Sequence, residues 1–297
     1  MKETLPLVSI ALCTYNGQDY LATQLDSILA QDYANIEIVI SDDCSTDNTV
    51  AIIREYVSSN PGINFKVNEH NLGFNQNFLS TISSCKGEYI AISDQDDIWN
   101  SNKITMMIRN VGNNLLIYHD SVFIDENGVP NGKSISSLHH FVKGESTIQL
   151  LYNNCISGHA CLIAKELFKY VHEIPEGIYY DWWFGYIAAC ENRLNFVKEK
   201  LVQHRRHNKS STATDKKNNK EIRRQQLTYF ANYLSTPPKT KKLLYDLLEG
   251  YHVLDVKSFS PRLLFTLLKN FHSLFYIRKR SIFSKLKIVL AECRRNP

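Results

Sequence analysis

Short apolar runs alternate with amphipathic segments over the first ninety or so residues, and this alternation limits the possible folds more than any other feature. The apolar runs cover residues 7–13, 36–40, 63–67 and 88–93. Between them, apolar side chains recur at helical spacing over residues 21–29, 50–57 and 74–82. Strands that alternate with helices at this length predict an α/β fold with a parallel sheet and right-handed crossovers.

Three polar loops follow strands of this predicted sheet. They read TYNG (14–17), SDDCSTD (41–47) and SDQDD (93–97). Ligands of open α/β sheets bind beyond the carboxyl ends of the strands, where these loops would meet. The first loop has no G-x-G-x-x-G, which argues against a dinucleotide fingerprint, and no G-x-x-x-x-G-K-[ST] occurs, which excludes a P-loop.

The third loop concentrates negative charge. Asp94, Asp96 and Asp97 lie within four residues and would repel one another without a cation. Oxygen ligands at a strand end suit Mg²⁺ or Mn²⁺, which often also bind phosphate oxygens. The alternative is that Asp96 or Asp97 caps a helix beginning at Ile98.

Charge is distributed unevenly along the 297 residues. Residues 1–204 contain 13 Lys and Arg against 24 Asp and Glu, whereas residues 205–297 contain 21 against 6. The composition changes after Arg205, and DKKNNKEIRRQQ (215–226) is the predicted boundary before helices separated by Pro237-Pro238 and Ser260-Pro261. Residues 115–118 and 122–124 are predicted strands, and 179–183 open an apolar helix that runs to about Ala189.

Cysteine and apolar content indicate a globular protein of a reducing compartment. Seven cysteines are scattered with no C-x-x-C pair, which favours reduced, mostly buried thiols over a zinc site or disulfides. No apolar stretch approaches the roughly 20 residues of a membrane span, and MKETLPLVSI lacks the sections of a signal peptide. We expect a cytoplasmic protein, with peripheral contact to the inner face of the cell membrane as an option.

The order of four motifs identifies a family. VSIALCTYNG, IEIVISDDCSTDNT, NLGFNQN and GEYIAISDQDDIW closely resemble glycosyltransferase family 2, and the likeness covers residues 5 to about 210. The resemblance implies a GT-A fold, a Rossmann-like, mostly parallel sheet flanked by helices, and a nucleotide diphosphate sugar as donor. It implies a catalytic domain at 1–215, with a nucleotide-binding part at 1–100 and an acceptor part at 101–215, followed by a basic helical region at 216–297.

Three sequence segments resemble one group within this family. SDQDDIW, SGHACL and DWW look most like bacterial rhamnosyltransferases, which use dTDP-L-rhamnose to build O-antigen or capsule chains. The expected acceptor is a glycan, free or linked to a polyprenyl diphosphate. The Q-x-x-R-W element and membrane spans of processive relatives are absent, so one sugar is expected per encounter.

The resemblance also implies the site residues. The metal ligands would come from Asp96, Asp97 and His207, with His207 preferred over His204, and the ion would be Mg²⁺ or Mn²⁺. Asp43, with Asp42 beside it, would bind the pyrimidine base. The residues implied in nucleotide-sugar binding are Thr14, Tyr15, Asn16, Asp42, Asp43, Asn75, Asp94, Gln95, His159, Trp182 and Arg206.

Asp181 is the predicted general base. An inverting transfer needs a carboxylate on the acceptor side of the anomeric carbon, hence on a different loop from the metal site. Taken alone, an Asp before an apolar helix is more often an N-cap. Many relatives have Glu where this chain has Tyr180, which leaves Asp181 as the local candidate.

Two other functions fit the sequence less well than a glycosyltransferase, and the C-terminal region suits more than one partner. A sugar-nucleotide nucleotidyltransferase would show a Gly-rich, basic first loop, which LCTYNGQDY is not. A non-catalytic nucleotide- or glycan-binding domain would lack either the base or the family's D-x-D, which Asp94 and Asp96 match here, and both are present. The basic, apolar C-terminal helices suit an anionic membrane surface, or packing on the catalytic domain or on a second subunit of a homodimer. Nucleic acid is not expected, because no recognised module is present.

Overall fold

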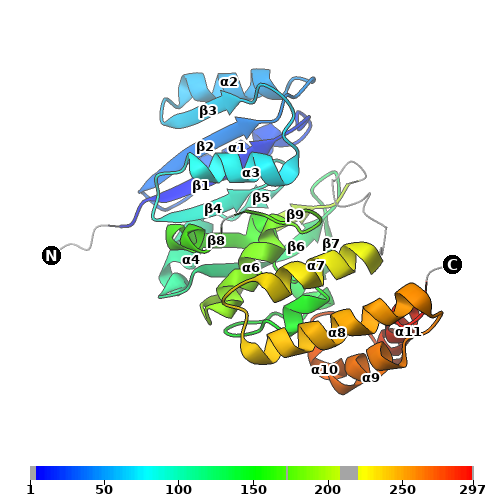
Figure 1. Ribbon diagram of the computed structural model, residues 1–297. Helices are drawn as coiled ribbons and strands as arrows, with labels where there is room; N and C mark the ends of the chain where they lie inside the picture. The colour runs from blue at the N-terminus through cyan, green and yellow to red at the C-terminus, as the bar shows by residue number, and fades with distance from the viewer. Residues whose placement is uncertain (1–4, 172, 208–219, 296–297) are drawn as a thin grey trace.

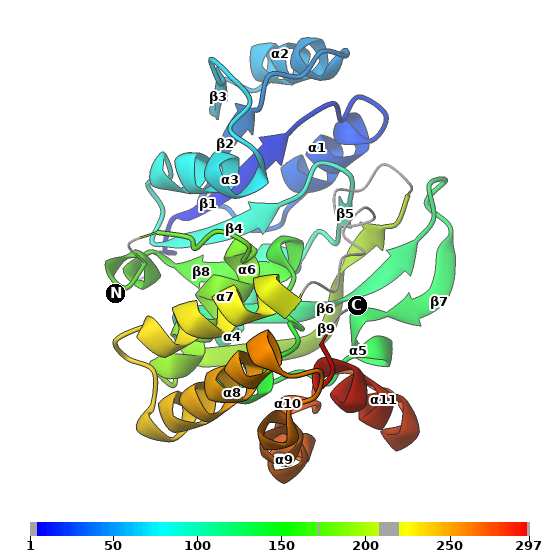
Figure 2. The ribbon, with the colours of Figure 1, turned by 45° about the vertical axis from the view of Figure 1, so that its right-hand side comes forward.

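The computed structural model describes residues 5–171, 173–207 and 220–295. Residues 1–4 of the N-terminal segment, 208–211 of the basic loop and 215–219 of the predicted boundary lie outside the described residues. A nine-stranded sheet of order β3-β2-β1-β4-β8-β6-β9-β5, with β7 paired to β6, forms the centre (Figures 1 and 2). Helices flank it on both faces, which confirms the predicted α/β class.

The first half of the sheet is parallel, as predicted. Its strands pair in the register that sets Val8 opposite both Ile36 and Tyr89. Their carboxyl ends therefore lie along one edge, which is where the three polar loops begin. The strands of this half are β1 (Val8–Thr14), β2 (Ile36–Asp42), β3 (Ile63–Val67) and β4 (Tyr89–Ser93).

The second half is mixed. β8 (Cys161–Ala164) runs antiparallel to β4 and to β6 (Leu116–Ile124), and β9 (Leu194–Arg205) runs parallel to β6. The two strands predicted at 115–118 and 122–124 are one strand, whose register with β9 shifts near Asp120. β7 (Pro130–Ser134) extends this half as a hairpin.

No helix starts at Ile98. Instead β5 (Ile98–Trp99) pairs with Gln203 and Val202 of β9, and α4 (Lys103–Val111) begins after it with Asn102 as its cap. The helix-capping alternative for Asp96 and Asp97 is therefore wrong. The pairing also brings the end of β9 beside the acidic loop.

Two hydrophobic cores lie on opposite faces of the sheet, because side chains alternate along each strand. In β1, Val8, Ile10 and Leu12 join one core, while Ala11 and Cys13 join the other. The first core is covered by α1 (Leu21–Leu29), α2 (Thr49–Ser59) and α4. The second is covered by α3 (Phe74–Ser83), α6 (Tyr180–Cys190) and helices from the C-terminal region.

The C-terminal region is helical, as predicted. Pro238 and Pro261 stand in the first turns of α8 and α9, where a missing backbone N–H costs nothing. Its helices are α7 (Lys220–Asn232), α8 (Pro238–Val256), α9 (Pro261–Lys269), α10 (Phe271–Leu274) and α11 (Ile282–Glu292). Of these, α8 to α11 gather at the end of the molecule farthest from α2, whereas α7 lies beside α6 (Figures 1 and 2).

These helices share a core with the sheet and its helices in the predicted catalytic domain. Phe230 of α7 stacks on Tyr186 of α6 with 4.1 Å between ring centroids and lies parallel to Trp183. Packing on the predicted catalytic domain is thus observed, while a division near residue 215 and a homodimer stay predictions. Five of the seven cysteines are buried, and all seven are free. In the described parts of the chain, no helix combines the length and the apolar character of a membrane span.

Candidate active site

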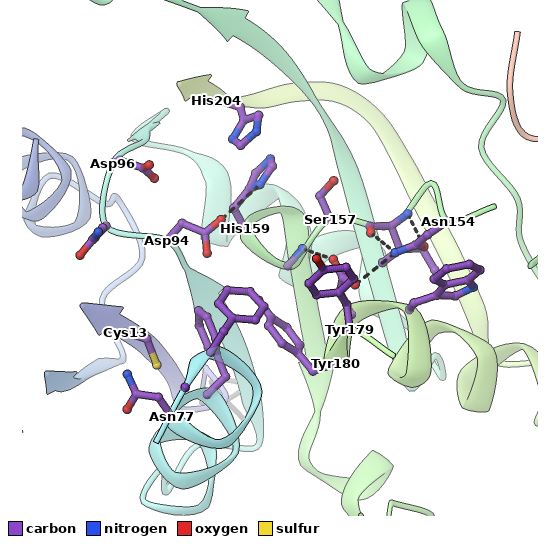
Figure 3. A pocket seen from close by; sticks show the side chains of 18 of the residues that line it. Cys13, Asn77, Asp94, Asp96, Asn154, Ser157, His159, Tyr179, Tyr180 and His204 are labelled. Carbon is purple, nitrogen blue, oxygen red and sulfur yellow. Dashed lines mark hydrogen bonds and ion pairs between the residues drawn. The ribbon is translucent and has the colours of Figure 1, made fainter. Parts of the chain in front are cut away.

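A cavity of about 740 Å³ opens at the carboxyl ends of β1, β2 and β4 and extends to α6 and the C-terminal helices. Figure 3 shows Asp94 and Asp96 facing His159 and His204, with Asn154 across the pocket. The predicted residues that line it are Thr14, Tyr15, Asp43, Asp94, Gln95, Asp96, His159, Asp181, Trp182, Arg206 and His207. Asn16, Asp42, Asn75 and Asp97 are not part of its lining.

Gln95 fixes the first loop to the acidic loop. Its Oε1 accepts from the backbone N–H of Tyr15 at 2.8 Å, and its Nε2 donates to the Tyr15 carbonyl at 3.0 Å. Any Cβ at position 17 would collide with the Gln95 side chain, so Gly17 is required for this approach. The Tyr15 ring stays half exposed at the cavity, where a flat base can stack on it.

Three of the predicted residues shape the loops. Asp42 is fully buried and accepts from the Thr14 hydroxyl at 2.7 Å and the Ser45 hydroxyl at 2.6 Å. Asn16 has positive φ, and its Oδ1 accepts from the Thr46 N–H at 2.8 Å. These contacts hold the first two loops together without presenting Asn16 or Asp42 to the cavity.

Asp43 lines the cavity and organises a fourth loop. Its carboxylate accepts from the N–H groups of Leu72 at 2.8 Å and Gly73 at 2.9 Å and from Asn68 Nδ2 at 2.8 Å. Gly73 has φ of 76°, which favours glycine, and it ends this loop just before α3. Asp43 thereby fixes the segment at the predicted base-binding end.

The acidic loop is held by histidines and an arginine from the end of β9. His204 Nδ1 lies 3.0 Å from Asp97 Oδ1, and His207 Nε2 lies 2.8 Å from Asp96 Oδ2. Arg205 donates its backbone N–H to Asp97 Oδ1 at 2.9 Å and its Nε to the Asp96 carbonyl at 2.9 Å. His204 and His207, the two candidate ligands from the sequence, therefore both contact this loop. The preference for His207 as a metal ligand stays a prediction.

His159 completes a group that fits a divalent cation. Its Nδ1 lies 3.8 Å from Asp97 Oδ2 and 3.8 Å from Asp94 Oδ2, and its ring stacks on His204. One donor atom each from Asp97, His159 and His204 lies within 4.8 Å of the others. Asp97 Oδ2 is buried and has no hydrogen-bond partner among the described residues. An orphaned carboxylate oxygen facing an imidazole nitrogen is what a cation site requires.

Burial and neighbouring charges shift the pKa values of the acids and histidines around this group. Burial and then the charges of Asp97 and Asp96 raise the pKa of Asp94 well above its usual value. Burial would lower the pKa of His204, but Asp97 beside it holds that pKa above the usual value. Burial, followed by the neighbouring His204, lowers the pKa of His159, so this imidazole is neutral and able to act as a ligand.

Asp181 occupies the first turn of α6, whose N-cap is Tyr179, so the N-cap alternative for Asp181 does not hold. Its Oδ1 accepts from Asn154 Nδ2 at 3.1 Å and its Oδ2 from the Gly158 N–H at 3.1 Å. Burial raises the pKa of Asp181 to about 7, although hydrogen bonds from Trp182, Gly158 and Asn154 oppose the rise. A carboxyl with this pKa suits proton removal near neutral pH.

Two residues position the start of α6. Asn75 lies outside the cavity, donates to the Ile178 carbonyl at 2.8 Å and accepts from the Tyr180 N–H at 3.2 Å. Gly158 packs against the buried Tyr180 hydroxyl so closely that any Cβ at position 158 would overlap it. Asn75 therefore acts here through the helix that carries Asp181.

Three residues that contact His159 or Asp181 could not be predicted from the sequence. Lys103 is fully buried and donates to the His159 carbonyl at 2.7 Å, and Ser121 lies 3.0 Å from His159 Nε2. Asn154, which contacts Asp181, is not among the residues that the resemblance implies. The three residues come from segments distant in sequence, so only the folded chain assembles them.

Comparison with known proteins agrees with this geometry. The family model described as glycosyl transferase family 2 matches residues 9–171. An uncharacterized glycosyltransferase of Haemophilus influenzae is 25% identical over 268 residues, which span 84% of this chain and 82% of the relative.

Two solved structures are similar in fold. S. aureus TarS 1–349 in complex with UDP-GlcNAc has a TM-score of 0.62 at 18% identity, covering 90% of this chain and 81% of TarS. The mannosyltransferase PcManGT from Pyrobaculum calidifontis, in complex with GDP-Man and Mn²⁺, has a TM-score of 0.51 at 16% identity, covering 97% and 80%. These likenesses confirm the predicted GT-A fold. Since the family model covers more than half of the sequence, the chain belongs to glycosyl transferase family 2.

Proposed function

We propose that this enzyme transfers a sugar from a nucleotide diphosphate sugar to a hydroxyl of a glycan acceptor, with inversion at the anomeric carbon. The observation that carries the proposal is that one cavity is lined by Asp181 and also by His159 and His204, which together with the buried Asp97 form a group that fits a metal ion. Asn154, which contacts Asp181, lies across the pocket from Asp94 and Asp96 in Figure 3. A single displacement needs a base and a leaving-group site separated in this way.

Asp181 is proposed to take the proton of the acceptor hydroxyl. The hydrogen bonds from Asn154 and Gly158 orient its carboxylate. Its pKa of about 7 leaves a large share ionised at neutral pH while the group remains basic enough to accept a proton. Because a carboxylate acts here only as a base, no covalent sugar–enzyme intermediate is required.

The donor is proposed to lie with its base near Tyr15 and Asp43 and its diphosphate near the acidic loop. Asp97, His159 and His204 would hold Mg²⁺ or Mn²⁺, so His204 replaces His207, the histidine preferred from the sequence, and His207 lies beside them against Asp96. When bound, such an ion stabilises negative charge on the departing diphosphate. Arg206 lines the same cavity and adds positive charge there. The Mn²⁺ in the PcManGT complex supports a metal-dependent reaction.

For the sugar we propose L-rhamnose from dTDP-L-rhamnose, in synthesis of a bacterial surface polysaccharide such as O-antigen or capsule. This proposal is supported by the segments SDQDDIW, SGHACL and DWW, which resemble those of bacterial rhamnosyltransferases. The neighbours in fold carry UDP-GlcNAc and GDP-Man, so these are the competing donors.

A peripheral membrane contact is proposed for the outer face of the C-terminal helices. Phe265, Ile282 and Phe283 are each about two-thirds exposed, at 68%, 66% and 69%. Lys285 and Lys287 follow Ile282 and Phe283 on α11, and a basic residue near anionic lipid contributes about 1 kcal/mol. Such a contact would suit a lipid-linked acceptor.

A thermal-unfolding panel tests the proposed function. The full chain is melted with dTDP-rhamnose, UDP-GlcNAc or GDP-mannose, each with and without Mn²⁺ or Mg²⁺. A donor at 100 times its dissociation constant stabilises the fold by about 2.7 kcal/mol. Metal-dependent stabilisation by one donor supports the proposal and names the donor. No stabilisation by any of them contradicts it.

A further inference from the structure

The C-terminal helices bring two arginines to the cavity. Arg223 comes from α7 and Arg278 from the segment after α10, and both line the cavity together with His139 and Tyr152. Both arginines lie beyond residue 171, where the match to the family model ends. The roles derived for the donor and for Asp181 leave these cations unused.

Arg278 has no acidic partner. Among the described residues, no carboxylate lies within ion-pair distance of its guanidinium. Burial, together with the charges of Arg280 and Arg223, lowers its pKa. Positive charges gathered at a cavity wall repel one another, so an anion there relieves the repulsion.

Arg223 is only partly satisfied. Its Nη1 donates to the Tyr152 carbonyl at 3.0 Å, but its Nε is buried with no hydrogen-bond partner and lies 3.8 Å from Glu292 Oε1. Glu292 also accepts from the Tyr251 hydroxyl at 2.6 Å. His139 Nδ1 is a second buried atom without a partner at this wall of the cavity. The unsatisfied Nε–H of Arg223, beside a guanidinium of Arg278 that has no ion-pair partner among the described residues, indicates a missing acceptor of hydrogen bonds.

The position of the two arginines relates them to the acceptor. Tyr152, whose carbonyl holds Arg223, lies two residues before Asn154, whose Nδ2 donates to Asp181. The guanidinium of Arg223 also lies over the Tyr152 ring, 4.7 Å from its centroid. Arg223 is therefore linked to the general-base end of the cavity, and Arg278 lies near enough for the charge of Arg223 to lower its pKa.

We propose that Arg223 and Arg278 bind an anionic group of the acceptor, a phosphate ester or a sugar carboxylate, while a neighbouring hydroxyl faces Asp181. This assignment rests on the proposed function and specifies the class of acceptor. Guanidinium groups bind both phosphate and carboxylate oxygens with paired N–H donors. A phosphate would come from a lipid-linked or phosphodiester acceptor, and a carboxylate from a uronic-acid residue.

Titration calorimetry of the full chain with inorganic phosphate and, separately, with glucuronate tests this subsite. The variants are Arg278→Gln, Arg223→Gln and the control Arg109→Gln, which removes an exposed charge at the end of α4, away from the cavity. Loss of a charged hydrogen-bond donor should weaken binding of the anion at least about tenfold in the first two variants and leave the control unchanged. The anion that binds more tightly to the unaltered chain indicates its source.

The outcomes separate this subsite from the donor site. If the unaltered chain and Arg278→Gln are stabilised alike by a nucleotide sugar while only the variant loses anion binding, both assignments stand. If no nucleotide sugar stabilises the unaltered chain, the proposed function fails. If donors bind but neither anion does, or Arg278→Gln binds the anion as tightly as Arg109→Gln, the subsite is overturned. Within the described part of the chain Arg278 has no ion-pair partner to lose, so its variant remains informative even if Arg223→Gln unfolds.

Discussion

The backbone N–H of Gly158 donates to Oδ2 of Asp181 across 3.1 Å, and the next residue, His159, faces Asp94 and Asp97. One short turn therefore contacts the group proposed as base and also supplies the imidazole proposed as metal ligand. This connection keeps the two ends of the proposed reaction at a fixed separation. It also means that a disturbance of the turn should affect both ends.

Replacing the proposed base should stop transfer and spare the donor. Asp181→Asn keeps the size of the side chain but removes its ability to accept a proton. We expect kcat to fall about 10²- to 10⁴-fold, the usual contribution of a general base, with donor stabilisation in thermal unfolding unchanged. Near-normal turnover of this variant would show that another group removes the proton.

The pH dependence of activity should follow Asp181. Because only the carboxylate accepts a proton and its pKa is about 7, kcat/KM should rise with pH and level off above about pH 7. Initial rates from pH 5.5 to 8.5 test this. A profile that is flat through pH 7 would contradict the assignment.

The stability of the fold should fall as the pH rises, whereas the activity should rise. The folded pKa of about 7 exceeds the unfolded value of about 3.9, so the folded state binds the extra proton between these values. The contribution of Asp181 to stability is therefore present at low pH and lost as pH rises towards 7. The unaltered chain should lose more stability between pH 5 and pH 8 than Asp181→Asn does. Equal losses in chemical denaturation would contradict the raised pKa.

A methyl group at position 158 should disrupt the site sterically. In Gly158→Ala the Cβ would overlap the Tyr180 hydroxyl, and overpacking of this kind costs about 1–3 kcal/mol. Tyr180→Phe removes the hydroxyl, so the double variant should recover part of the loss. Gly62→Ala is the control, since a Cβ there meets no atom within 4 Å. The measurement is the denaturant midpoint of the unaltered chain, the three single variants and the double variant. Equal stability of Gly158→Ala and Gly62→Ala would refute the packing.

Metal binding should depend on the acidic loop. We expect Asp97→Asn and Asp96→Ala to lose the Mn²⁺-dependent part of donor stabilisation and of turnover, and a chelator to do the same to the unaltered chain. Asp246→Asn, a partly exposed position on α8 outside the cavity lining, serves as the control. Full activity after removal of divalent cations would exclude a metal-dependent reaction.

Local sequence pattern predicted the parallel half of the fold because each strand and helix there carries its own periodicity. The alternation in 36–40 and the helical spacing in 21–29 depend on burial against one sheet, which is a local property. The second half could not be predicted as well. β5 has two residues, and β6 continues through Asp120, whose buried carboxylate accepts from the backbone N–H groups of Ser121 and Ser136.

The candidate site was predicted where its residues share a motif and missed where only the fold assembles them. Asp94, Asp96 and Asp181 stand in recognisable segments, and all three line the cavity. Lys103 and Arg278 have no such context, because an isolated basic residue in a sequence is usually solvated. Their positions depend on the path of α4 and of the C-terminal helices.

The most direct test of the central claim is the release of nucleoside diphosphate from a nucleotide sugar by the full chain, measured with and without Mn²⁺. The donor is the one selected by thermal unfolding, and a glycan acceptor or water takes the sugar. We predict metal-dependent release that is slow with water, faster with an acidic acceptor and lost in Asp181→Asn. A chain that binds the donor and metal yet releases no nucleoside diphosphate under any of these conditions would contradict the account.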